Sequence, residues 1–110
     1  MRVRAQYDGY AKLIVPHDHN RVLKEIEMRG TKEFDMDAGD GNAKVGITHG
    51  FKKWESSRDG GLTVEATVSV TLTCNQDEKT INLAADKASD LSEHQAQKGL
   101  NRMMEYLRGL

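Results

Sequence analysis

The stretch from Leu62 to Cys74 alternates strictly between apolar and polar side chains. Its apolar positions are Leu62, Val64, Ala66, Val68, Val70, Leu72 and Cys74, and threonine, serine or glutamate stands between them. A period of two is typical of a β-strand with one face in a core and the other in water. A sheet with one hydrated face is usually antiparallel, because parallel sheets are normally covered on both sides. We therefore expect this strand to belong to an antiparallel sheet.

Three further strands are predicted upstream, at residues 2–15, 31–37 and 43–54. Asp8 and Gly9 interrupt the first of them and favour either a two-residue hairpin turn or a bulge within one long strand. The pattern leaves both alternatives open, and it does not place this first strand in the sheet. The last two strands suit a hairpin that keeps the apolar residues on one side. The expected pairs are Phe51 with Val64, His49 with Ala66, Ile47 with Val68, and Val45 with Val70.

A short helix is predicted between the first two strands. Pro16 ends the first strand, and Asp18 or Asn20 is suited to cap the first turn of a helix. One side of this helix would carry Val22, Leu23 and Ile26. Gly30 follows at the position where helices commonly end.

A long helix is predicted over residues 75–107, where apolar side chains recur at helical spacing. Asn75 and Glu78 give it a cap-like start. The alternative is a break near residues 89–92, with residues 80–83 forming a short extra strand. The unbroken helix would match the length of the longest strand and could lie along it.

Together these elements predict an α+β fold in a single domain spanning residues 1–110. The expected architecture is a two-layer sandwich. An antiparallel sheet of about four strands would carry both the short helix and the long C-terminal helix on one face. The element order would be β-α-β-β-β-α.

Composition narrows the classes of function. The 110 residues include 16 Lys and Arg against 17 Asp and Glu, so the net charge is -1. A nearly neutral chain creates no global field toward nucleic acid or an anionic membrane. With one cysteine, no signal peptide and no long apolar segment, we expect a cytoplasmic protein that neither enters nor binds a membrane. No motif indicates a cofactor or a catalytic set.

His17 and His19 are weak candidates for a metal site, because two imidazoles flank Asp18. Together with His49 they define one alternative function, a His-based metal-dependent enzyme. A metal site needs three or four converging ligands, however, and neighbouring histidines in a loop are more often solvated surface. We therefore predict no metal.

Nucleic-acid binding is a second alternative. The expected order of helix, three strands and helix resembles that of double-stranded-RNA-binding domains, and the resemblance lies in element order alone. The candidate contacts are Lys52, Lys53, Trp54 and Arg58. The long helix begins with Asp77 and Glu78, which would repel phosphate.

The preferred interpretation is a small non-enzymatic binding, assembly or inhibitor-type protein, such as a phage accessory protein, that acts through its surface. Its partner would be another protein or a second copy in a homodimer. A threonine-rich hydrated sheet face suggests the surface, with Thr48, Thr63, Thr67 and Thr71 as candidates. Met104 and Tyr106 lie beyond the main apolar stripe of the long helix, and adaptable methionine is suited to partner contact.

Overall fold

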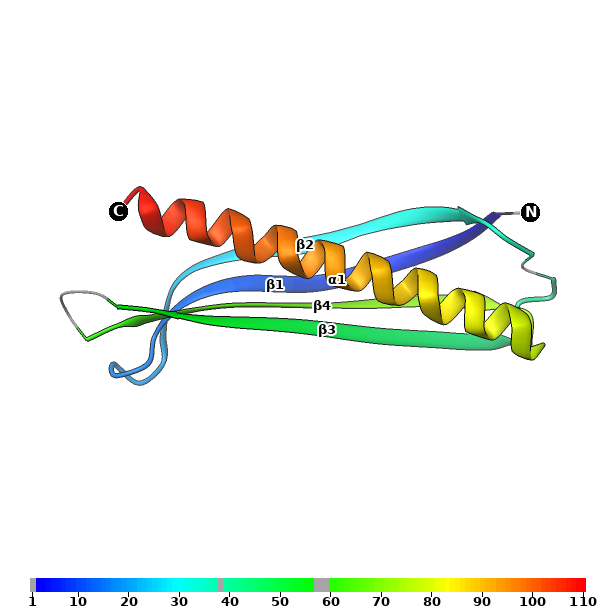
Figure 1. Cartoon of the computed structure of the whole chain (residues 1–110), viewed down its shortest axis with the longest axis horizontal. Coiled ribbons are helices and arrows are strands. Elements are labelled where there is room, and N and C mark those ends of the chain that lie inside the picture. Colours follow the sequence, from blue (N-terminus) through cyan, green and yellow to red (C-terminus); the bar gives the residue numbers. More distant parts are fainter. Residues whose placement is uncertain (1, 38, 57–59) are drawn as a thin grey trace.

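A computed structural model describes residues 2–37, 39–56 and 60–110. It contains four long strands followed by one long helix: β1 (Arg2–Val15), β2 (Arg21–Asp35), β3 (Ala43–Glu55), β4 (Leu62–Cys74) and α1 (Glu78–Arg108). The molecule is elongated, with extents of 55 × 21 × 16 Å, and α1 runs along the sheet for most of this length (Figure 1). The α+β class and the antiparallel sheet are as predicted.

The four strands form one antiparallel sheet in the order β2-β1-β4-β3. Two hairpins, β1–β2 and β3–β4, lie side by side, and β1 pairs with β4 at the centre. The pattern of burial along β4 follows the sequence alternation, since Val64, Val68 and Val70 are fully buried. The first strand, which the sequence did not place, is therefore one of the two central strands.

The prediction of a short helix between the first two strands is wrong, because residues 21–35 form β2. The preceding turn has φ values of 55° at His19 and 56° at Asn20, which suit a tight hairpin turn rather than a helix start. The resulting order is β-β-β-β-α. Period-two alternation in β2 is obscured by a register shift that leaves Leu23 unpaired and by lysines on its helix-facing side, such as Lys24.

Gly9 lies at neither a turn nor a bulge. It sits within the continuous strand β1, paired with Met28 on one side and Val68 on the other. A Cβ atom on Gly9 would overlap the main-chain carbonyl oxygen of Thr67. Glycine at this position therefore allows the two central strands to approach closely.

The predicted register of the β3–β4 hairpin is also wrong, by two residues. Phe51 pairs with Ala66, and the other observed pairs are His49 with Val68, Ile47 with Val70, and Val45 with Leu72. An offset of an even number of residues keeps the apolar residues on the same face. The side of the sheet on which these residues lie was therefore predicted correctly. The predicted register would draw Gly61 into the strand, but Gly60 and Gly61 have φ values of 106° and 117° and belong to the connecting loop. Pairing consequently begins at Leu62.

The helix α1 is continuous, and the alternative of a break near residues 89–92 is not realised. It starts slightly later than predicted, because the cap is Asp77 rather than Asn75. The side chain of Asp77 accepts a 2.9 Å hydrogen bond from the main-chain N–H of Thr80.

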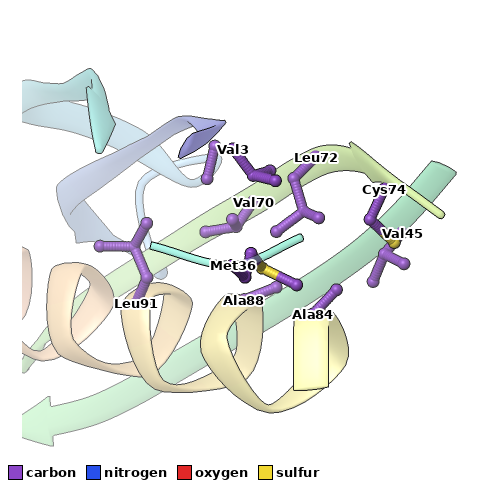
Figure 2. Close-up of a cluster of buried hydrophobic side chains, with 10 residues drawn as sticks. Val3, Met36, Val45, Val70, Leu72, Cys74, Ala84, Ala88 and Leu91 are labelled. Atoms are coloured by element: carbon purple, nitrogen blue, oxygen red, sulfur yellow. The ribbon is translucent and has the colours of Figure 1, made fainter. Parts of the chain in front are cut away.

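The core lies between α1 and the sheet (Figure 2). At one end, small helix residues such as Ala84 and Ala88 pack against Val70 and Leu72. Further along, Gly99 is tightly enclosed, since an added Cβ would lie 3.3 Å from Met28. Small side chains along one stripe of α1 bring the helix axis close to the strands.

Candidate functional site

The candidate site is the face of the sheet that points away from α1, here called the open face. Within the described residues, no helix or strand covers this face (Figure 1). At one end of it, Pro16 and Asn20 of the β1–β2 turn line a hollow of about 350 Å³ together with Lys52, Thr63 and Glu65. The remainder of the face is formed by alternate side chains of all four strands.

The strand registers align the open-face side chains into cross-strand rows. Read from β2 to β3, the complete rows are Thr31/Gln6/Thr71/Gly46, Arg29/Asp8/Ser69/Thr48, Glu27/Tyr10/Thr67/Gly50, Glu25/Lys12/Glu65/Lys52 and the uncharged row Val22/Ile14/Thr63/Trp54. Beyond Gln6, the next row comprises the pairs Glu33/Arg4 and Thr73/Lys44. Neighbours within a row have their Cβ atoms about 4.5–5.5 Å apart and can interact directly.

Charges on these six rows are balanced. The acids are Asp8, Glu25, Glu27, Glu33 and Glu65, and the bases are Arg4, Lys12, Arg29, Lys44 and Lys52. Arg29 donates a 3.2 Å hydrogen bond to Asp8 and also lies 3.5 Å from Glu27. The hydrogen bond from the guanidinium to Asp8, together with the charge of Asp8, raises the pKa of Arg29. In the row Glu25/Lys12/Glu65/Lys52, acid and base alternate across the whole sheet.

The centre of the open face is uncharged on the β3–β4 side. The hydroxyls of Thr48 and Ser69 are hydrogen-bonded to each other at 2.7 Å. Gly46 and Gly50 leave the main chain of β3 bare of side chains at two positions on this face. A shallow hollow of about 530 Å³ lies beside this region and includes Gln6, Asp8, Arg29, Thr31, Ser69 and Thr71 in its lining.

Of the predicted partner-binding residues, Thr48, Thr67 and Thr71 lie on the open face and are accessible. Thr63 also points to this side but is only 6% exposed. The two candidates on the helix are not part of the open face. Met104 is 8% exposed and belongs to the core, contrary to the suggestion of a surface position, whereas Tyr106 is 38% exposed, with Lys24 Nζ 5.3 Å from its ring centroid.

Sequence reasoning missed the β1 and β2 members of the open face, among them Tyr10, Lys12 and Arg29. The sequence did contain a signal for the open-face positions of β1, because polar and apolar residues alternate along residues 2–6. Lys12 Nζ lies 4.0 Å from the centroid of the Tyr10 ring, which places both side chains along the sheet surface.

The candidate nucleic-acid residues do not form a common basic patch. Lys52 is directly opposite Glu65 on the open face, while the next residue, Lys53, points to the helix side and lies 3.4 Å from Glu55. Trp54 is 62% exposed. Arg58 lies outside the described residues. The double-stranded-RNA-binding element order, which required the short helix, is not present.

The candidate metal ligands also lie apart. His17 and His19 are in the β1–β2 turn, whereas His49 is on the helix-facing side of β3, opposite Val68. Among the described residues, no three His, Cys, Asp or Glu side chains are grouped as a metal site would require. Cys74 is buried, and it pairs with Ala43 rather than lying near His49.

Comparison of the chain with known protein families, curated proteins and solved structures finds no match. In the described part of the chain, no helix has the length and apolar character needed to cross a membrane.

Proposed function

We propose that this protein is a non-enzymatic assembly module that pairs with a second copy of itself through the open face. The observation that carries this proposal is the in-register balance of charge on a broad sheet face that no described helix or strand covers. One hydrated face is ordinary in an antiparallel sheet. A face whose rows hold equal numbers of acids and bases is distinctive, because it neither repels a copy of itself nor favours a strongly charged partner.

The size of the face suits such an interface. Strands about 4.8 Å apart and rows about 6.7 Å apart give four strands and six rows an area of roughly 770 Å² per copy. Stable interfaces bury about 600–1,000 Å² on each partner. The hydroxyl and glycine positions on the β3–β4 side of the centre, such as Thr48 and Gly46, carry no formal charge. The charges on the β1–β2 side of the centre are already paired, because Arg29 contacts both Asp8 and Glu27, and this pairing offsets part of the cost of burying them.

The two alternative functions have less support. The lysines proposed to contact phosphate are each matched by an acid, Lys52 by Glu65 and Lys53 by Glu55. The histidines proposed for catalysis lie on different elements, so they do not form a site within the described residues.

Molar mass measured by light scattering over a concentration series tests the proposal. We expect a mass that rises toward twice the 12.3 kDa of one chain. Thr67→Lys and Thr71→Lys, at the centre of the open face, should shift association to at least tenfold higher concentration. Asn82→Lys adds the same charge on an exposed position of α1 and is the matched control. A monomeric mass at every concentration, or equal association by the variants and the wild type, would contradict the proposal.

A further inference from the structure

We infer that the two copies stack open face to open face about a two-fold axis that runs parallel to the strands, between β1 and β4. The inference rests on the proposed self-assembly and adds its geometry. A two-fold axis in this position places β2 of one copy over β3 of the other, and β1 over β4. Every cross-strand row then meets the same row in reverse order.

Reversal makes the two outer charged rows complementary. In the row Glu25/Lys12/Glu65/Lys52, Glu25 comes over Lys52 of the second copy and Lys12 comes over its Glu65. At the other end, Glu33 comes over Lys44 of the second copy. Each contact occurs twice because the interface is two-fold symmetric. Opposite charges therefore meet on both sides of the three middle rows of the open face.

Reversal also brings large side chains over small ones in the middle rows. Tyr10 comes over Thr67 of the second copy, and Thr31 comes over Gly46. Glu27 comes over Gly50, which has no side chain to collide with it. Alternation of large and small residues across facing positions allows two surfaces to interdigitate.

The other in-plane axis, perpendicular to the strands, gives the opposite result. It keeps each strand over its own copy and reverses the order of the rows. With this axis through the row of Arg29 and Thr48, Glu33 would face Glu25, Lys44 would face Lys52, and Arg29 would face its own copy. Like charges brought together at an interface are costly. The charge pattern thus distinguishes the two orientations.

Sheet twist is compatible with the parallel axis. Stacked sheets cross at about 30°, which displaces the facing side chains of the outer rows by roughly 5–7 Å. The outer charged rows carry long Glu and Lys side chains, which can span this displacement. In the centre row, where the two copies superpose most closely, the paired Arg29 and Asp8 of one copy lie over the short side chains of Thr48 and Ser69 of the other.

Cysteine cross-linking with a short bismaleimide tests the orientation directly. With the parallel axis, position 73 in the two copies is about 10–15 Å apart, and position 48 is about 17 Å apart with diverging side chains. With the perpendicular axis, the separation at position 73 is about 26 Å, and position 48 faces its own copy at about 10 Å. Thr73→Cys should therefore cross-link and Thr48→Cys should not. Both variants are made in the Cys74→Ala background, and the Cys74→Ala protein without a new cysteine is the negative control for cross-linking.

Charge reversal provides a second, independent measurement. Glu25 and Lys52 lie on the two edge strands of one copy, with β1 and β4 between them, so they do not pair within the chain. Glu25→Lys and Lys52→Glu should each raise the dissociation constant about tenfold, and the double variant should recover most of this loss. Thr80 and Asn82 are on α1, on the opposite side of the sheet from the open face. Asn82→Lys therefore again serves as the matched charge control.

The outcomes separate the inference from the proposed function. A dimer in which Thr73→Cys cross-links and the double charge variant recovers association supports the parallel axis. A dimer in which Thr73→Cys remains unlinked, or in which the double variant is weaker than either single one, overturns the orientation and leaves self-assembly intact. Absence of any dimer overturns the proposed function itself.

Discussion

The hydroxyl of Ser92, near the middle of α1, donates a 2.6 Å hydrogen bond to the main-chain carbonyl oxygen of Val68 on β4. Both residues are fully buried. A buried hydroxyl without a partner would be costly, so this bond favours one rotation of the helix against the sheet. The bond also explains why Ser89 and Ser92 do not end the helix. The hydroxyl of Ser92 bonds to the strand instead of to the main chain of the helix.

Replacement of Ser92 by alanine should lower the free energy of unfolding by about 1–2 kcal/mol, because it removes a buried hydrogen bond. Urea denaturation measures this change. Ser89→Ala, at a half-buried position of the same helix, should change stability by less than about 0.5 kcal/mol. Equal effects at both positions would show that the bond contributes nothing specific.

Gly9→Ala should destabilise the protein by about 2–3 kcal/mol, since the new methyl group overlaps the carbonyl oxygen of Thr67 and forces the central strands apart. Gly46→Ala is the matched control, because its Cβ would have its nearest neighbour at 3.7 Å, on Thr71. Thermal denaturation of both variants checks the difference. A Gly9→Ala protein as stable as the control would contradict the close approach of β1 and β4.

The cap at Asp77 should make stability depend on pH. The hydrogen bonds from Thr80 lower the pKa of Asp77 below its ordinary value of 3.8. Its contribution is therefore complete above pH 3.8 and is lost as pH falls through the lower pKa of the folded state. Urea midpoints measured across this range should fall less steeply with pH in Asp77→Asn. Asp86→Asn, exposed on the same helix, is the control, and an unchanged slope in Asp77→Asn would refute the prediction.

Cys74 should react with thiol reagents only when the protein opens. Burial, followed by the nearby charge of Asp77, raises the pKa of the Cys74 thiol and disfavours the reactive thiolate. The residue is also 0% exposed. We expect reaction with a chromogenic disulfide to be slow in the native protein and fast in urea. Rapid native reaction at the rate of a free thiol would show that this end of the core is open.

Substitutions at Met104 and Tyr106 should differ, although the residues are close in sequence. Met104 is 8% exposed and packs in the core beside Met103 and Leu100. Met104→Glu buries a carboxylate there and should cost more than about 3 kcal/mol. Tyr106→Glu, at a position that is 38% exposed, should cost about 1 kcal/mol. Similar denaturation midpoints for the two variants would contradict this assignment.

About half of the open face could be recognised from the sequence. The β4 positions Thr67, Ser69 and Thr71 follow from strict alternation, and Thr48 follows from its neighbour strand. The β2 positions could not be found, because the unpaired Leu23 and the lysines on the helix-facing side of this edge strand break the period of two. The row in which Glu25 and Lys52 occupy opposite ends became visible only with the strand order.

Local periodicity by itself determined the strand β4, the side on which its apolar residues lie, the long helix and the antiparallel α+β class. These features depend on side chains that are close in sequence, so each can be inferred from a short window. The tertiary structure alone decided that β1 is central, that residues 21–35 form a strand, and that β3 is offset by two residues against β4. Such features depend on which distant segments satisfy each other's main-chain hydrogen bonds, and on glycines such as Gly9 and Gly61 whose required geometry is set by the neighbouring strand or loop.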